Sequence, residues 1–209
     1  NLDINTDFSI FELGINKSNE MTNLVKTLRP HYALVTGIEN SHIGNFRNFR
    51  HLVDNKLKIF NSDRLISGLL NYNYDPYYVK TKLHSKVKLI NIYELNKNSI
   101  KIRNKYIINF SENSREFKIE SYRGSFYENI AIISFLFLKK LKINLRLKTF
   151  FYEESIIESR GKEISTYIKS KRVKFFDHSY NASPYSLNKQ ILIFNERIIN
   201  QKVYILGSM

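Results

Sequence analysis

Cysteine is absent from the 209 residues of this chain. Its absence excludes disulfide bonds and thiolate-bound metal sites, and it fits a reducing compartment such as the cytoplasm. Long apolar runs are also missing. The longest, residues 130–138, covers about nine residues and is interrupted by Ser134, whereas a membrane span needs roughly twice that length. We therefore expect a buried helix there, no membrane insertion and, since no leader pattern follows Asn1, no signal peptide.

Acidic residues are scarce: 19 Asp and Glu face 33 Lys and Arg, which gives a formal net charge of +14. Such an excess is one mark of proteins that bind nucleic acid or membrane surfaces. The basic residues are nevertheless spread along the whole chain, and Lys, Asn and Ile abound throughout, as AT-rich codon usage would produce. We therefore expect no nucleic-acid partner and keep a basic nucleic-acid binder as an alternative.

The alternation of apolar segments predicts an α/β fold with a mostly parallel sheet and flanking helices. Residues 7–13 are typical of a strand ending at Gly14, residues 19–28 have helical spacing up to Pro30, and residues 32–36 are a second apolar strand. A strand, a helix and a strand within about 30 residues form a βαβ unit, which implies parallel pairing.

Further elements follow the same reasoning. We expect a helix over residues 48–60, a strand over 87–92, an antiparallel hairpin over 99–120 that turns near residues 111–114, and a helix over 128–141.

A turn at residues 159–162 is the best candidate for a domain boundary. It divides the chain into residues 1–158 and residues 159–209. In the second part, a strand over 173–177, a helix over 184–198 and a strand over 202–206 that ends at Gly207 predict another βαβ unit. That unit would be the beginning of a Rossmann-like domain.

Two groups of residues stand where an α/β sheet collects ligands, outside the carboxyl ends of its strands. Glu12 and His42 follow the first two predicted strands, so one sheet edge could bring them together around a divalent cation. From spacing alone, a capping Glu and a surface His are the interpretation that we favour. Residues 176–184 join a strand to a helix with small polar residues and a Pro, which suits phosphate or ribose contacts but also an ordinary helix cap.

A resemblance changes the weight of these patterns. It rests on Phe-Glu-Leu-Gly at 11–14, Asn-Glu-Met at 19–21, Arg-Pro-His-Tyr-Ala-Leu-Val-Thr at 29–36, Ser-His-Ile-Gly-Asn-Phe at 41–46, Asp-His-Ser-Tyr-Asn-Ala-Ser-Pro at 177–184 and Val-Tyr-Ile-Leu-Gly-Ser-Met at 203–209. In their order and spacing these segments resemble the Mur ligases, and within that family the branch that adds D-alanyl-D-alanine. Residues 1–158 would be the central, ATP-binding domain and residues 159–209 the beginning of the C-terminal domain.

The resemblance implies an ADP-forming amide ligase of peptidoglycan synthesis, monomeric and cytoplasmic, with ATP and Mg²⁺ as cofactors. ATP would phosphorylate the terminal carboxylate of UDP-N-acetylmuramoyl-tripeptide. The amine of D-alanyl-D-alanine would then attack the acyl phosphate. Such chemistry needs positive charge against phosphoryl oxygens and tight positioning of the reactants.

By the resemblance, Glu12 and His42 would bind Mg²⁺, and Lys56 falls where the family carries a carbamylated lysine that supports a metal. The plain interpretation of Lys56 is one more solvated lysine. Asn71 resembles an Asn in a turn of the family and stays open between a substrate-binding and a structural role.

Arg160, Asp177 and Asn181 match positions that face the nucleotide in the family. The phosphate loop that the family needs, Gly-x-x-x-x-Gly-Lys-Ser/Thr, does not occur in the sequence. We expect it before Asn1, in a longer protein of which this chain is an internal piece, and we expect no turnover from the chain alone.

Several positions depart from the family pattern. Gly37 stands for a usual Asn, Lys58 for a usual Glu, and His178 and Ser208 for usual aspartates, while residues 124–129 blur a Gly-x-His-Asn pattern. Lys58 lies two residues after Lys56, about 200° round a helix, so we expect it to face solvent and leave a carbamate on Lys56 intact. The alternative is that Lys58 enters the site, supplies positive charge itself and makes the carbamate partly redundant. Two alternatives stay open: a sister ligase with another amino-acid substrate, and a diverged, non-catalytic remnant that acts as a binding module.

Overall fold

The computed structural model describes residues 5–39, 43–103, 105–121, 125–143, 149–150, 162–180, 184–197 and 201–207. The chain forms two compact units, an N-terminal unit of residues 1–91 and a C-terminal unit of residues 92–209. The predicted division near residue 159 falls among residues 151–161, outside the described part, and stays a prediction. Within the described part, no helix is long and apolar enough to cross a membrane.

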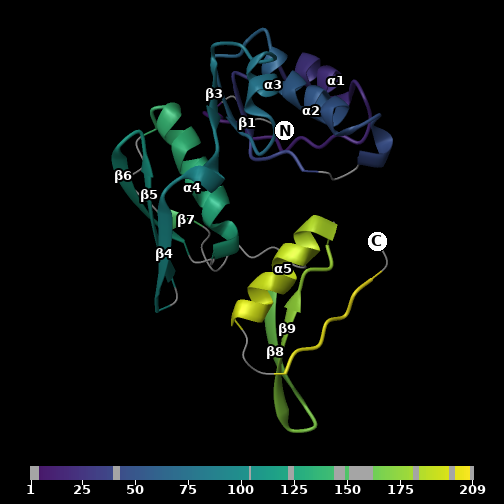
Figure 1. The fold of residues 1–209 in the computed structure, drawn as a ribbon, viewed down its shortest axis with the longest axis vertical. Helices are drawn as coiled ribbons and strands as arrows, with labels where there is room; N and C mark the ends of the chain where they lie inside the picture. Colours follow the sequence, from purple (N-terminus) through teal and green to yellow (C-terminus); the bar gives the residue numbers. More distant parts are fainter. Residues whose placement is uncertain are drawn as a thin grey trace. The chain divides into compact units, whose positions relative to one another are not determined.

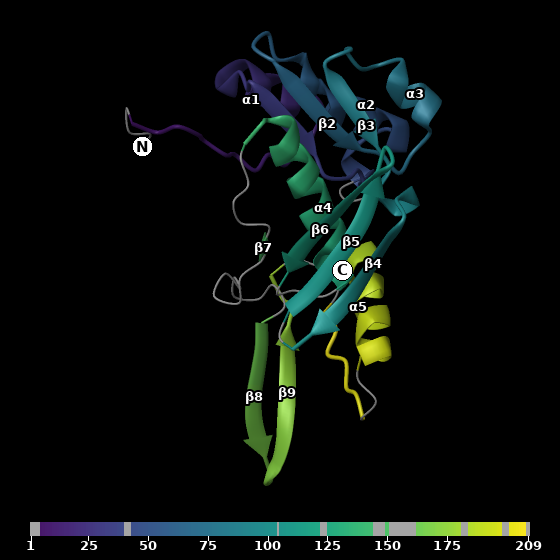
Figure 2. The same cartoon turned by 90° about the vertical axis from the view of Figure 1, so that its left-hand side faces the viewer.

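A parallel three-stranded sheet forms the centre of the N-terminal unit, in the order β1-β2-β3. Strands β1 and β3 are labelled in Figure 1, and β2 is labelled in Figure 2. The strands are β1 (Tyr32–Val35), β2 (Ser67–Asn71) and β3 (Val87–Ile90). The intervening helices are α2 (Phe49–Leu57), continued by the 3-10 turn η2 (Lys58–Asn61), and the short α3 (Pro76–Lys80); the 3-10 turn η1 (Ile43–Asn45) precedes α2. This arrangement confirms the predicted α/β class, the helix over 48–60 and the strand over 87–92.

Local sequence signals set the helix ends in this unit. Helix α1 (Glu20–Leu28) ends where Arg29 takes a left-handed conformation, with φ of 46°, and Pro30 cannot continue it. Asn48 caps α2 by accepting a hydrogen bond from the His51 N–H at 2.9 Å. Asp75 caps α3 in the same way, directly before Pro76.

The core of the N-terminal unit lies where α2, η2 and α3 pack on the sheet. Its buried members come from both layers: Ala33, Ile38, Val53, Leu57, Phe60, Leu65, Leu70 and Val79. A second cluster joins α1 to α2 through Ile15, Met21, Val25, Phe46 and Leu52. Helix α2 therefore contacts both clusters, which fixes its position against the strand ends.

The predicted strand over residues 7–13 is wrong. These residues form no strand, and Phe8, Ile10 and Phe11 are exposed. The apolar pattern is that of a strand, but a strand also needs a neighbour for its backbone hydrogen bonds, and this segment pairs with none of β1, β2 and β3. The parallel βαβ units are instead β1-α2-β2 and β2-α3-β3.

The C-terminal unit begins with the 3-10 turn η3 (Ile92–Glu94) and an antiparallel meander of β4 (Lys97–Ile102), β5 (Lys105–Glu112) and β6 (Arg115–Ser121), to which β7 (Thr149–Phe150) adds in parallel. The β5–β6 turn contains Asn113 and Ser114, both left-handed, which confirms the predicted hairpin. Helix α4 (Ser125–Lys140) packs on this sheet through Phe135, which contacts Phe110 and Phe117.

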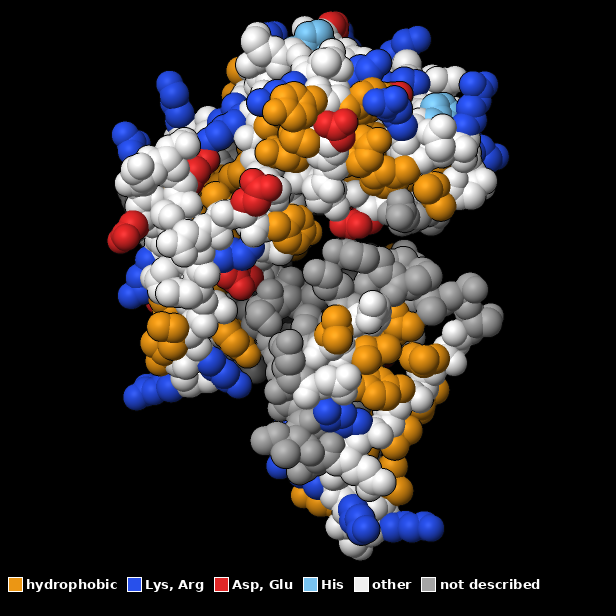
Figure 3. All heavy atoms as spheres, viewed as in Figure 1, with side chains coloured by type: hydrophobic (Ala, Val, Ile, Leu, Met, Phe, Trp, Pro, Cys, Tyr) orange, Lys and Arg blue, Asp and Glu red, His pale blue; other side chains and the backbone are white. Residues whose placement is uncertain are grey.

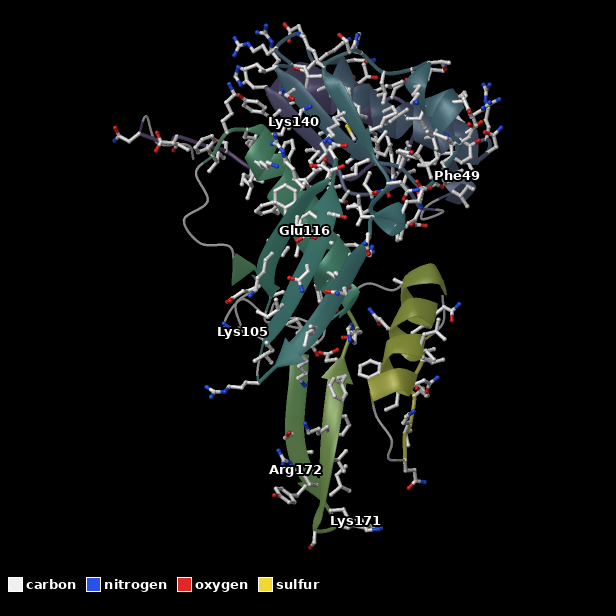
Figure 4. All side chains as sticks on the ribbon, turned by 60° about the vertical axis from the view of Figure 1, so that its left-hand side comes forward. Phe49, Lys105, Glu116, Lys140, Lys171 and Arg172 are labelled. Atoms are coloured by element: carbon white, nitrogen blue, oxygen red, sulfur yellow. The ribbon has the colours of Figure 1, made fainter. Side chains whose placement is uncertain are left out.

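The last described elements are an antiparallel hairpin of β8 (Lys162–Ile168) and β9 (Lys171–Asp177), followed by α5 (Pro184–Arg197) (Figure 2). Phe176 at the base of the hairpin packs on Phe194 of α5, with ring centroids 4.7 Å apart. Lys171 and Arg172 lie at the hairpin turn and point away from the strands (Figure 4). The strand over 173–177 and the helix over 184–198 are confirmed.

The strand predicted over residues 202–206 is absent, because residues 201–207 have no strand partner in the described structure. The second βαβ unit is therefore wrong as an arrangement: β9 pairs with β8, antiparallel, and not with a following parallel strand.

Basic side chains lie over several elements on the face of the molecule that Figure 3 draws. In the face drawn in Figure 3, Lys and Arg lie over the N-terminal unit, along the β4–β6 meander and at the turn of the β8–β9 hairpin, with Asp and Glu between them. This distribution matches the dispersal of charge along the sequence.

Candidate active site at the strand ends

The carboxyl ends of β1, β2 and β3 meet at one edge of the sheet, because the strands are parallel and paired in register. Asn71 is the last residue of β2 and is only 2% exposed. Its Nδ2 donates a hydrogen bond of 2.9 Å to the carbonyl oxygen of Thr36, which directly follows β1. The predicted site residue Asn71 therefore has a structural task, which is to hold the loop that leaves the neighbouring strand.

A second side-chain contact joins the same two segments. Asn73, two residues beyond the end of β2, donates from Nδ2 to Oε1 of Glu39 at 2.9 Å. Together, the Asn71 and Asn73 bonds hold residues 36–39 against the end of β2. This loop leads toward residue 42, in the part of the family pattern that carries His42.

Lys56 lies in the last turn of α2, near enough to Glu39 of this edge for the Glu39 charge to act on it. It is half-buried, and burial lowers the pKa of its ammonium below the ordinary value of 10.5, while the negative charge of Glu39 acts in the opposite direction. The structure therefore brings Lys56 close to a carboxylate at the strand ends. A lowered pKa increases the neutral fraction of the Lys56 amine, and the neutral amine is the nucleophilic form.

Aromatic side chains in and just before α3 also hold α2 in place. Tyr78 donates its hydroxyl hydrogen to Oδ1 of Asp54, and the Arg50 guanidinium lies 4.0 Å from the centroid of the Tyr78 ring. Burial, together with the Asp54 carboxylate, raises the pKa of Tyr78 to about 12. Phe49, labelled on α2 in Figure 4, packs edge-on against Tyr74 at 5.0 Å. These contacts fix the helix that carries Lys56.

Lys58 lies outside this cluster. Its Nζ donates to Oδ1 of Asn19 and to Oδ1 of Asn55, each at 3.0 Å. The expectation that Lys58 faces solvent is therefore wrong, because the side chain is half-buried and its ammonium is bound by two asparagine oxygens.

Of the predicted metal pair, Glu12 and His42, the structure describes only Glu12. Glu12 has an exposed side chain in a segment without regular secondary structure, and His42 lies outside the described residues. In the part of the chain that is described, no group of three or more His, Cys, Asp or Glu side chains could hold a metal ion. The convergence of Glu12 and His42 stays a prediction.

The residues predicted to face the nucleotide are placed in the same partial way. Asp177 is the last residue of β9, and its Oδ1 accepts a hydrogen bond of 3.0 Å from the backbone N–H of Ser179. This bond closes the turn that follows β9. Arg160 and Asn181 lie outside the described residues.

Glu39 and Asn73 were not predicted as site residues. A signal existed in both cases, since Glu39 lies in the loop after an apolar strand and Asn73 follows Asn71 at strand spacing. The contact between them depends on the pairing of β1 with β2, which the sequence pattern did not reveal.

Comparison with known families identifies the fold. The profile of the Mur ligase middle domain matches residues 1–136. The chain belongs to the Mur ligase family. The match covers the parallel sheet of the N-terminal unit and, in the C-terminal unit, the β4–β6 meander and α4 up to residue 136.

Curated Mur ligases resemble the chain along its whole length. The UDP-N-acetylmuramoyl-tripeptide–D-alanyl-D-alanine ligase of Rickettsia prowazekii is 24% identical over 220 residues, which cover 98% of this chain and 47% of that protein. The ligase of the same name from Buchnera aphidicola is 25% identical over 218 residues, covering 100% and 46%. The chain thus spans about half the length of the curated relatives that it matches.

Solved structures of this ligase share the fold. MurF from Acinetobacter baumannii superposes with a TM-score of 0.68 at 16% identity, over 87% of this chain and 41% of that one. MurF from Thermotoga maritima, solved in complex with ADP, superposes with a TM-score of 0.61 at 15% identity, over 86% and 42%. These likenesses confirm the α/β architecture of a Mur ligase central domain.

Proposed function

We propose that this chain is the central part of an ATP-dependent, ADP-forming ligase that joins D-alanyl-D-alanine to UDP-N-acetylmuramoyl-tripeptide in the cytoplasm. The observation that carries the proposal is Lys56, a half-buried lysine with a lowered pKa at the carboxyl ends of parallel strands. The names of the two curated relatives that match the whole chain support the choice of substrates.

The chemistry of Lys56 fits a carbamate. A neutral amine is the form that reacts with carbon dioxide, and burial favours that form in Lys56. The product is an anion on a side chain that α2 holds at the strand ends. With Glu12 it would offer the carboxylate oxygen donors that Mg²⁺ prefers, and His42 would add an imidazole nitrogen. Bound there, Mg²⁺ would offset negative charge on the phosphoryl oxygens of ATP.

The remaining residues would position the reactants. Asn71 and Asn73 keep residues 36–39 in place, so that the loop leading to His42 does not move away from the strand ends. In the reaction, the tripeptide carboxylate takes the γ-phosphoryl group and ADP leaves. The dipeptide amine then attacks the carbonyl carbon, a C–N bond forms, and phosphate departs with the electrons of the broken C–O bond. We assign Arg160, Asp177 and Asn181 to the nucleotide side.

The test is ADP release by a complete protein that carries this chain together with a phosphate-binding loop. With ATP, Mg²⁺ and UDP-N-acetylmuramoyl-tripeptide, ADP should form when D-alanyl-D-alanine is added and not when single amino acids are added. Lys56→Ala should abolish most of this activity, and formate or acetate should restore a part of it by replacing the carboxylate. ADP formation with a single amino acid instead would identify a sister ligase.

A non-catalytic remnant is the second candidate, and Gly37 favours it because the family usually has Asn there. The departure from the family pattern at Lys58 does not favour the remnant, because two asparagine side chains accept hydrogen bonds from its ammonium. Nucleotide binding without ADP formation under any combination of substrates would establish the remnant.

A further inference from the structure

Asn55 is a buried amide whose orientation is fixed by backbone groups. It lies in α2, directly before Lys56, and is only 1% exposed. Its Nδ2 donates to the carbonyl oxygen of His51 at 2.8 Å, and its Oδ1 accepts from the backbone N–H of Asn19 at 3.1 Å. Rotating the amide by half a turn would lose both bonds, so Oδ1 must point toward Asn19 and residue 58.

Lys58 supplies a second donor to Oδ1 of Asn55. Its Nζ binds Oδ1 of Asn55 and Oδ1 of Asn19, both at 3.0 Å. Hydrogen bonds from an ammonium are stronger than those between neutral groups. A Glu at position 58 would instead place its carboxylate near Oδ1 of Asn55. Because the Asn55 amide is held by two backbone groups, these oxygens would repel each other. The fixed amide at position 55 therefore favours a basic residue at position 58.

Asn19 is the end of the loop that this network fastens. It has a left-handed backbone, with φ of 70°, directly before α1, a conformation that costs free energy in a residue with a side chain. The loop in front of it is also held: Oε2 of Glu20 accepts from the N–H groups of Asn16 and Lys17 at 2.6 and 2.9 Å. Ile15 is buried in the same core cluster as Leu52 of α2.

We propose that Lys58 is a positioning residue, which ties the loop of residues 15–19 to α2 and so sets the position of Glu12 relative to Lys56. The tie itself follows from the hydrogen bonds of Asn19 and Asn55. Its consequence for a metal site rests on the proposed function, in which Glu12 and Lys56 act together.

The tie is tested by amide hydrogen exchange in the 209-residue chain. Lys58→Met keeps the aliphatic stem and removes the ammonium, and Lys58→Arg restores a cationic donor. Lys26→Met, an exposed lysine of α1, is the matched control. Lys58→Met should speed exchange at residues 16–19 at least tenfold and leave β2 unchanged, while Lys58→Arg and Lys26→Met resemble the wild type.

Unchanged exchange at residues 16–19 in Lys58→Met would overturn the tie, and so would an equal acceleration throughout the N-terminal unit. If Lys58→Met does not fold, Lys58→Gln takes its place, and Lys58→Glu should then be the more strongly affected of the two. Equal exchange in Lys58→Gln and Lys58→Glu would also count against the fixed orientation of Asn55.

The consequence for the site is tested with Mn²⁺ as the probe, followed by its electron paramagnetic resonance signal. Folded Lys58→Met should bind Mn²⁺ at least tenfold more weakly than the wild type, with binding restored in Lys58→Arg and unaffected in Lys26→Met. Equal binding in Lys58→Met would overturn the positioning role. A wild-type chain that binds no Mn²⁺ overturns the link to a metal site and counts against the proposed function, while the exchange experiment still decides the tie.

Discussion

Replacing Gly68 with alanine tests how closely η2 packs on the central strand. Gly68 lies in β2, and a Cβ there would be 2.7 Å from Cε1 and 2.8 Å from Cδ1 of Phe60, with Cγ2 of Val87 at 3.2 Å. Ordinary contacts between carbon atoms begin near 3.5 Å. Phe60 is only 1% exposed and cannot move into solvent. The crowding should therefore cost about 1–3 kcal/mol of unfolding free energy.

Urea unfolding followed by circular dichroism measures this cost. Gly14→Ala is the matched control, because no atom lies within 4 Å of its added Cβ. Phe60→Leu makes room for the new methyl group, so Gly68→Ala combined with Phe60→Leu should be more stable than the sum of the single changes predicts, by roughly 1 kcal/mol. A Gly68→Ala chain as stable as Gly14→Ala, or strict additivity in the double variant, would refute this packing.

Three further predictions concern the site and its support. Glu39→Gln should lower the pKa of Lys56 further, seen by NMR of ¹³C-methylated lysines, and an unchanged Lys56 titration would contradict the influence of the Glu39 charge. Since burial already lowers that pKa, the contribution of Lys56 to stability is present above pH 10.5 and is lost as pH falls through the folded-state pKa. Asn71→Ala should cost about 1–3 kcal/mol in urea unfolding because a carbonyl after β1 loses its donor, and wild-type stability would contradict this. Ultraviolet titration should find Tyr78 ionising at about pH 12, with its stabilisation lost between pH 10 and 12 and its pKa lower in Asp54→Asn; an unchanged pKa in that variant would argue against the hydrogen bond.

Helices and tight turns were predictable because their signals are local. Pro30 ends α1, the apolar spacing of residues 48–60 gives α2 and η2, and the polar residues 111–114 mark the β5–β6 turn. Each of these depends on residues a few positions apart, and the physical causes (a missing N–H, one buried helix face, left-handed backbone) are present in the segment itself.

Strands were less predictable because a strand is defined by its neighbour. Residues 7–13 and 202–206 have the composition of strands and form none, since no described strand pairs with them. The central strand β2 was missed, because its short run contains Gly68, a residue that strands disfavour. Gly68 is there for a packing reason, the close approach of Phe60.

Of the site, resemblance to a family supplied Lys56 and Asn71, and the structure places both at the strand ends. Neither composition nor spacing could give the contacts around them, because these contacts join distant residues. Asn71 bonds to Thr36, 35 positions away, and Asn73 bonds to Glu39, 34 positions away. For Lys58, helix spacing gave only that its side chain leaves α2 on a different side from that of Lys56. Its two asparagine partners required the packing of α1 against α2.

The central claim is that Lys56 is a reactive lysine of a Mur ligase site, and carbon-13 NMR tests it most directly. The chain is incubated with ¹³C-bicarbonate and Mg²⁺, and carbamate carbons are observed in the wild type, Lys56→Ala and Lys58→Ala. The account predicts a carbamate signal in the wild type that persists in Lys58→Ala and disappears in Lys56→Ala. Absence of the signal from the wild type, or its survival in Lys56→Ala, would contradict the claim.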